Sequence, residues 1–221
     1  MNFLSHGLLV RRTGSDAVLI GSALPDLAPL ADRQLRMTPR RIDLLDAIGD
    51  PEVARGCRHH RQVDRTFHHG RPFNEAQKRI EATLPPGPLP LPRGLLAHVL
   101  VEIGIDAEVL RAYPEFATRT YPDGFESFDW TSLFGRMREV CLAPTDALEG
   151  LVGRFDSGAF LHTYATDDGV LDRFHGMVAR LGRGGLTPET RDSLLPAVAL
   201  AREHSREAFD DLMPWELELQ E

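Results

Sequence analysis

Apolar residues recur at helical spacing along almost the whole of this 221-residue chain. Residues that repeat every three or four positions share one face of an α-helix and can be buried together. The alternating pattern of a half-buried β-strand is absent. We therefore predict an all-α fold, a multi-helix bundle that forms a single domain over residues 1–221. This length is sufficient to bury a core of its own.

Proline and glycine divide the pattern into separate helices. Pro25 is expected to stop the second helix, and Pro51 is expected to start a long one. The prolines between 84 and 92 predict a stiff connector, and Pro196 predicts a kink. We expect helices near residues 2–11, 15–24, 51–67, 72–84, 93–111, 125–141, 144–154, 167–182 and 188–211, with a looser Arg-rich stretch at 31–48.

The composition disfavours several classes of protein. No apolar run approaches the roughly 18 residues that span a membrane. The first ten residues show neither a basic leader nor a cleavage site, so we expect a cytoplasmic protein without a secretory signal. Cys57 and Cys141 form no CxxC motif and are expected to be buried small hydrophobes. The net charge of −8 argues against a nucleic-acid binder.

The charge is unevenly distributed along the chain. Residues 1–80 carry 13 basic and 9 acidic side chains, whereas the remainder carries 12 basic and 24 acidic ones. One interpretation is a chance asymmetry on solvated faces. The other is that the basic segment attracts an anionic substrate.

Histidine and carboxylate residues form two pairs at helical spacing. His60 and Asp64 are four residues apart, and so are His98 and Glu102. Residues at i and i+4 share a helix face, so each pair can direct an imidazole and a carboxylate at one point. The neighbours of Glu102 are nearly all apolar, and a buried carboxylate is costly unless it is paired or bound to a metal. The pairs therefore predict a metal site between helices.

Other side chains extend this candidate set. His6 lies on a helix expected to pack against the core, and Asp26 follows Pro25, where it either projects from a rigid turn or caps the next helix. His59 is expected to face away from His60. We predict the following metal ligands: His6, Asp26, His60, Asp64, His69, His98 and Glu102. Such a set suits manganese or zinc, and iron or nickel also remain open.

Several stretches resemble the acyl-carrier-protein phosphodiesterases. Met1-Asn-Phe-Leu-Ser-His6 is similar to their opening, and Gly21-Ser-Ala-Leu-Pro-Asp26 is similar to their Gly-Asn-Leu-x-Pro-Asp turn. Gly56-Cys-Arg-His-His-Arg-Gln-Val-Asp-Arg-Thr-Phe67 resembles their central Gly-x-x-x-His-Arg-x-Ile-Asp-x-Phe motif. Phe160-Leu-His-Thr-Tyr164 resembles a C-terminal Trp-Leu-x-x-Tyr segment. The resemblance implies an all-helical, manganese-dependent enzyme of lipid metabolism that releases 4′-phosphopantetheine from acyl carrier protein.

The chain departs from that pattern at two places. It reads Phe67-His-His-Gly-Arg-Pro72 where the family has Phe-Thr-Asp-x-His-Pro. It also has Glu102 and Ile103 where the family has Asp-His, so Ile103 removes one metal-competent side chain. The departures leave a metal site with more nitrogen and less oxygen, and they leave the substrate open. The paired motifs also resemble, more thinly, the zinc-dependent phospholipase C and single-strand nuclease group.

The resulting hypothesis is a metal-dependent phosphodiester hydrolase. We assign catalytic roles to Asp64 and to Arg61, which with Arg58 would hold phosphate through its guanidinium. An equal alternative for Arg61 is an ordinary surface ion pair. The alternatives are a phospholipase-like or nuclease-like enzyme, and a non-catalytic helical binding protein whose His and carboxylate groups only satisfy one another. His162, His175 and His204 lack a ligand pattern and are expected to be structural or exposed.

Overall fold

The chain is mostly helical in the part that the computed structural model describes, residues 3–13, 15–153, 161–180 and 184–219. No strand occurs among these residues, which confirms the all-α prediction. The longer helices are α2 (Asp16–Ala31), α4 (Pro51–His69), α5 (Arg71–Thr83), α6 (Arg93–Ala112), α8 (Trp130–Cys141), α11 (Asp167–Arg180) and α12 (Pro188–Glu207). The shorter elements are α1 (Phe3–Val10), η1 (Arg11–Thr13), η2 (Arg33–Leu35), α3 (Pro39–Ala47), η3 (Phe116–Thr120), α7 (Tyr121–Ser127), α9 (Asp146–Val152), η4 (Thr163–Ala165), α13 (Phe209–Leu212) and η5 (Trp215–Leu217).

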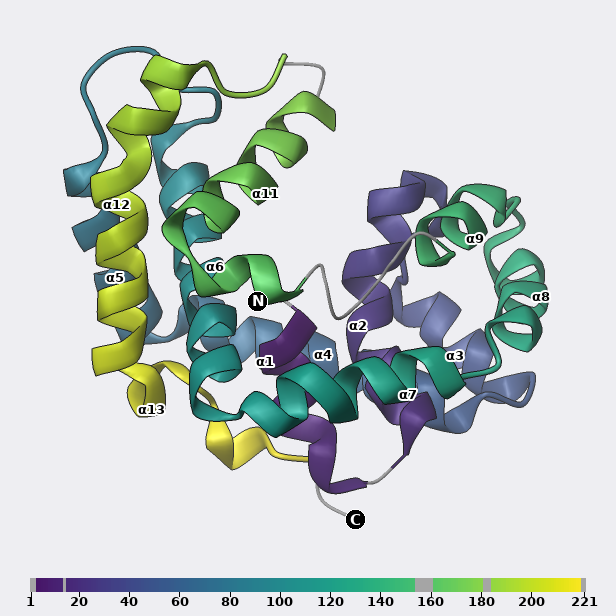
Figure 1. Cartoon of the computed structure of the whole chain (residues 1–221). Coiled ribbons are helices and arrows are strands. Elements are labelled where there is room, and N and C mark those ends of the chain that lie inside the picture. The colour runs from purple at the N-terminus through teal and green to yellow at the C-terminus, as the bar shows by residue number, and fades with distance from the viewer. Residues whose placement is uncertain (1–2, 14, 154–160, 181–183, 220–221) are drawn as a thin grey trace.

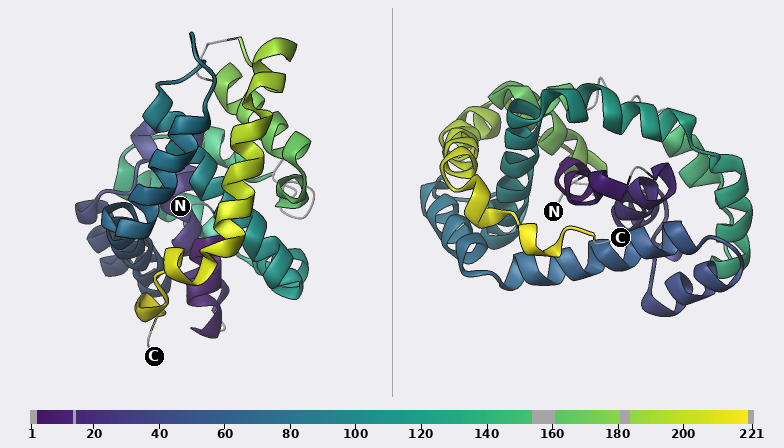
Figure 2. Two further views of the ribbon diagram at one scale, coloured as in Figure 1. Left: turned by 90° about the vertical axis from the view of Figure 1, so that its left-hand side faces the viewer. Right: turned by 90° about the horizontal axis from the view of Figure 1, so that it is seen from below.

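Helix α1 lies at the centre of the molecule. Figure 2 shows the purple N-terminal segment enclosed by a ring of later helices when the molecule is viewed from below. Every residue of α1 is buried, and α1 packs against α2, α4 and α6. Helices α5, α6, α11 and α12 lie on one side of it, and α2, α3, α8 and α9 lie on the other (Figure 1). The core therefore forms around the segment that carries His6.

Helix α2 does not end at Pro25, contrary to the prediction. It continues through Pro25 and Pro29 to Ala31, so Asp26 lies inside a helix and not in a turn after it. Each proline removes one N–H donor, but the helix is held by packing against α1, α4, α7 and α9. That burial stabilises the helical path at the cost of two hydrogen bonds.

Other boundaries differ by smaller amounts. The helix expected at 125–141 is two helices, because the side chain of Asp129 accepts from the Ser132 N–H and caps α8 separately from α7. The segment at 188–211 divides into α12 and α13, and α12 runs through Pro196. The Arg-rich stretch at 31–48 contains η2 and α3. Residues 1–2, 154, 160 and 181–182, which figured in the expected helices or motifs, lie outside the described residues.

Two further expectations are confirmed. Cys57 and Cys141 are both buried free thiols. Among the described residues, no helix combines the length and the apolar character that crossing a bilayer requires.

Candidate metal centre

Asp106 of α6 fixes the position of His6. Its carboxylate accepts hydrogen bonds from the backbone N–H groups of Leu4 (3.1 Å) and Ser5 (2.9 Å). The first N–H groups of a helix have no partner within the helix, so Asp106 caps α1 from another element. His6, one residue further on, has 0% exposure, and neither of its ring nitrogens makes a hydrogen bond to a residue that the structure describes. Nε2 only approaches an oxygen of Asp64, at 3.3 Å, so buried His6 lacks the hydrogen bonds that a core imidazole usually makes.

A contact between two glycines brings α2 and α4 together. A Cβ atom on Gly21 would lie 2.2 Å from the Val53 carbonyl oxygen, and one on Gly56 would lie 2.3 Å from the Val18 carbonyl oxygen. Only hydrogen is small enough at these positions, so the two backbones touch. This approach lets His60 of α4 donate from Nδ1 to the Ser22 carbonyl oxygen of α2 at 2.7 Å.

The first group of candidate ligands surrounds the His60 ring. His60 Nε2 lies 3.6 Å from Asp26 Oδ1 and 3.6 Å from Asp64 Oδ2. The second Asp64 oxygen, Oδ1, lies 3.3 Å from His6 Nε2. The rings of His6 and His60 stack with centroids 3.8 Å apart. Four residues from α1, α2 and α4 thus bring two nitrogens and two carboxylates to one point.

The charges within this first group are strongly coupled. Burial lowers the pKa of His6 well below its ordinary value, so this imidazole is neutral at pH 7. Burial alone would lower the pKa of His60 as well, but the carboxylates of Asp26 and Asp64 raise it overall. Burial would raise the pKa of Asp64, yet contacts with the two imidazoles hold it far below its usual range. Burial raises the pKa of Asp26 to about 6, because His60 only partly opposes it.

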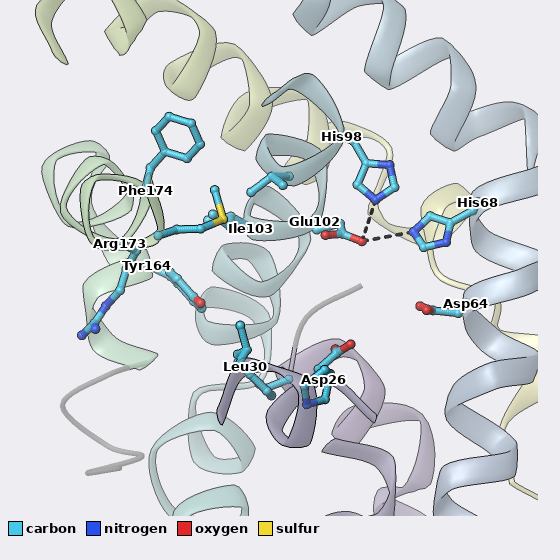
Figure 3. Close-up of a pocket in the computed structure, with 14 residues that line it drawn as sticks. Asp26, Leu30, Asp64, His68, His98, Glu102, Ile103, Tyr164, Arg173 and Phe174 are labelled. Carbon is cyan, nitrogen blue, oxygen red and sulfur yellow. Dashed lines mark hydrogen bonds and ion pairs between the residues drawn. The ribbon is translucent and has the colours of Figure 1, made fainter. Parts of the chain in front are cut away.

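The second group joins α4 to α6. His68 Nε2 and His98 Nε2 converge on the same Glu102 oxygen, Oε1, at 3.1 and 3.2 Å. Burial would raise the pKa of Glu102, but the two imidazoles help to hold it well below its ordinary value. The three side chains come from facing helices and converge in front of one open space, as Figure 3 shows.

Both groups border one cavity of about 470 Å³. Asp26 and Asp64 of the first group line it, and so do all three members of the second group. In Figure 3, Asp64 lies below the contacts of His68 and His98 with Glu102, with its carboxylate directed into the same space as Asp26. The cavity therefore gives one entering molecule access to both sets of ligands.

The structure places six of the seven predicted ligands in two groups: His6, Asp26, His60 and Asp64 meet in the first, and His98 and Glu102 lie in the second. The seventh predicted ligand, His69, lies outside both groups. It is exposed, and its Nδ1 donates to the Arg65 carbonyl oxygen of its own helix. His68 takes the place that we assigned to His69. The signal was in the sequence, since His60, Asp64 and His68 follow one another at intervals of four and share a helix face.

The two arginines expected to hold phosphate lie elsewhere. Arg58 forms ion pairs with Asp43 and Asp46. Arg61 is exposed and, with Arg58, borders a separate hollow between α3 and α4. The structure thus directs Arg61 away from the cavity, because α4 turns its His60–Asp64–His68 face toward α2 and α6.

Sequence reasoning missed the cationic residue that does line the cavity. Arg173 of α11 borders it, with its Nε donating to Thr163 Oγ1 at 2.8 Å, and Tyr164 of η4 lies beside it. Tyr164 belongs to the segment that resembles Trp-Leu-x-x-Tyr, but no motif marks Arg173, because only the return of α11 across the molecule brings it to the cavity. His175 and His204 lie outside the cavity, near Leu186 and Arg79 respectively.

The spacing of the donor atoms suits a divalent cation. Ligands about 2.0–2.2 Å from a cation, at tetrahedral or octahedral angles, lie about 3.0–3.5 Å from one another. The donor pairs quoted above lie 3.1–3.6 Å apart. His6, Asp26 and His60 form one set whose donor atoms all lie within 4.8 Å of one another, and His68, His98 and Glu102 form another. The residues present therefore fit a metal, and the lack of a hydrogen bond from either ring nitrogen of buried His6 to the described residues favours one.

Comparisons with known proteins found no family model, no curated protein and no solved structure that matches this chain.

Proposed function

We propose that this protein is a metal-dependent hydrolase of phosphodiesters. The proposal is carried by one observation: buried His6 and His60 meet carboxylates from two helices at the wall of a cavity that a second His/carboxylate group also borders. The mixture of nitrogen and oxygen donors suits manganese or zinc. One or more such ions would be held by His6, Asp26, His60 and Asp64, together with His68, His98 and Glu102.

The hydrogen bond from His60 to the Ser22 carbonyl oxygen helps to distinguish a metal site from a group of core residues that only satisfy one another. A carbonyl oxygen only accepts, so His60 Nδ1 carries a proton, and a neutral His60 then directs the lone pair of Nε2 at Asp26 and Asp64. A lone pair that faces carboxylates at 3.6 Å is repelled unless a cation or a proton lies between them. The backbone contact is also the kind that orients a metal-binding imidazole.

The site supports hydrolysis through several complementary roles. A bound divalent cation would lower the pKa of a water ligand and neutralise charge on the phosphoryl oxygens. Asp64, whose pKa is far below its usual range, stays ionised and orients a water molecule at the cavity wall. Where the second group holds no ion, His98, which has 30% of its side chain exposed, is positioned to pass a proton to a leaving group, with Glu102 fixing its ring. Arg173 gives the cavity wall a positive charge that attracts an anionic ester.

Metal analysis and a chromogenic diester test this proposal together. We expect the purified protein to contain manganese or zinc in stoichiometric amount and to hydrolyse bis-p-nitrophenyl phosphate only when loaded. His60→Ala should lose both properties. His59→Ala is the matched control, because His59 lies on the other side of α4 against the Leu217 carbonyl oxygen. A protein that binds no metal, and whose stability a chelator leaves unchanged, would instead support the non-catalytic network.

The substrate implied by the family resemblance is holo acyl carrier protein. Release of 4′-phosphopantetheine from it, followed by mass spectrometry, is the first natural reaction to assay. A metal-loaded protein that cleaves the chromogenic diester but leaves the carrier intact would direct the search to phospholipase-like or nuclease-like substrates.

A further inference from the structure

The cavity changes character away from the metal ligands. Beyond the two groups its wall is formed by apolar side chains from α1, α2, α6 and α11, namely Phe3, Leu30, Val99, Ile103, Phe174 and Met177. Figure 3 shows Ile103 and Phe174 on the side away from His68, with Leu30 below them. A molecule that reaches the metal ligands therefore also contacts an apolar surface.

Exposed leucine side chains extend the apolar wall beyond the cavity. Leu30 is 54% exposed, although it follows a buried stretch of α2, and it borders the cavity. Leu95 of α6 is 47% exposed and lies four residues before Val99, on the same helix face. The apolar wall thus continues outward from the cavity, where these side chains would gain from being covered.

The few polar groups on this part of the wall narrow the choice of substrate. Among the described lining residues outside the two ligand groups, the polar side chains are those of Tyr164 and Arg173. A sugar or nucleoside would lose water from several hydroxyl or ring-nitrogen groups here and find too few partners, which is costly. An alkyl or acyl chain loses nothing of this kind and gains by leaving water.

We propose that the substrate is a phosphate ester in which one ester group is an apolar chain. The phosphate lies at the His/carboxylate groups, and the chain lies along Ile103, Phe174 and Met177, with Leu30 at the edge. The cavity of about 470 Å³ falls within the range of roughly 300–1,000 Å³ that holds a small organic ligand. This inference rests on the proposed function, since the ligand groups must bind the phosphate.

Binding of alkyl phosphates to the metal-loaded protein tests the inference without turnover. Titration calorimetry would compare inorganic phosphate with ethyl, butyl, hexyl and octyl phosphate, each below its micelle concentration. We expect the dissociation constant to fall about fourfold for each methylene over the first members, as burial of a methylene predicts. Leu30→Gln and Met177→Gln should flatten this dependence on chain length and leave the affinity for inorganic phosphate unchanged.

Two matched controls exclude nonspecific adsorption of the chain. Leu44 is 41% exposed on α3 and lies away from the cavity, so Leu44→Gln should keep the full dependence. Ala179→Gln places the same side chain on an exposed position of α11 and should also keep it. Equal affinity for all chain lengths, with inorganic phosphate still bound, would overturn the inference and leave the proposed function standing. Failure of the loaded protein to bind inorganic phosphate would overturn both.

Discussion

At the scale of single residues, neighbours decide what each histidine can do. His60 is held by a backbone carbonyl on Nδ1 and faces carboxylates with Nε2, whereas the adjacent His59 contacts the Leu217 carbonyl oxygen on the other side of the helix. His68 meets Glu102, whereas adjacent His69 points to solvent. A helix rotates adjacent side chains by about 100°, so a difference of one position separates a candidate ligand from a bystander.

The adjacent pair His68 and His69 gives a direct test of the site. We expect His68→Ala to weaken manganese or zinc binding by at least about tenfold, since even partners of metal ligands commonly contribute that much. His69→Ala should leave the affinity unchanged, because that ring is exposed. Competition with a fluorescent chelator measures both constants. Equal effects in the two variants would contradict the assignment of His68.

Asp106 predicts a pH dependence of stability. Burial raises the pKa of Asp106 to about 7, above its ordinary value of 3.8. The folded state therefore holds this proton more tightly than the unfolded state does, and the associated stability is present at low pH and lost as pH rises from about 4 to 7. The full loss is up to about 4 kcal/mol.

The unsubstituted protein and the variant Asp106→Asn differ in this contribution to stability, because the amide of the variant does not titrate. We expect the unfolding free energy of the unsubstituted protein, relative to the variant, to fall between pH 4.5 and pH 8 in urea titrations. A constant difference between the two proteins over that range would show that Asp106 does not titrate as described.

At the scale of elements, the approach of α2 to α4 builds the first ligand group. Gly21 and Gly56 let the backbones touch, and this contact places Asp26 of α2 opposite His60 of α4. Helix α6 supplies His98 and Glu102 of the second group and the cap of α1. The ligand groups therefore depend on helix spacing as much as on the ligands themselves.

Substitution of Gly56 tests the role of helix spacing. Gly56→Ala would place Cβ against the Val18 carbonyl oxygen, so we expect a loss of about 1–3 kcal/mol or more in stability, with weaker metal binding. Gly135→Ala is the matched control in α8, where, apart from the adjoining backbone of the helix, no atom of the described residues lies within 4 Å of the added Cβ. That variant should gain about 0.5–1 kcal/mol from the better helix former. Denaturation and metal titration of both variants measure the difference, and unchanged metal affinity in Gly56→Ala would contradict the argument.

Periodicity predicted the helices well because each one buries an apolar stripe. It failed at Pro25, where the local rule predicts an end but contacts with four other helices hold α2 together. The pairs His60–Asp64 and His98–Glu102 were visible because they lie four residues apart on one helix. The choice between His68 and His69 depends on the rotation of α4, and the arrival of Arg173 at the cavity depends on the path of α11. Neither is encoded locally.

At the scale of the whole molecule, the two ligand groups join helices from distant parts of the chain. The first joins α1, α2 and α4, and the second joins α4 and α6. A cation that binds such groups binds the folded state alone and stabilises it by mass action. Without a cation, the carboxylates of Asp26 and Asp64 face the Nε2 lone pair of His60 unless that ring takes up a second proton.

Removal of metal should therefore lower the thermal stability of the protein. At a free metal concentration of 100 times the dissociation constant, we expect excess chelator to lower the Tm by roughly 5–10 °C. His60→Ala should start near the lower value and respond little to the chelator. Differential scanning calorimetry gives both transitions, and a chelator-insensitive Tm in the metal-loaded protein would contradict the proposed centre.

The cap on α1 also has a consequence for biosynthesis. Asp106, whose carboxylate accepts the hydrogen bond from the Leu4 N–H, lies 102 positions further along the chain. Contacts of such long range form late, because the entropy of closing the intervening loop must be overcome first. During translation, His6 would emerge from the ribosome well before α6 exists to fix it. A nascent chain that stops short of α6 should therefore lack an ordered first helix, and the capacity to retain metal should arise abruptly once residue 106 is available.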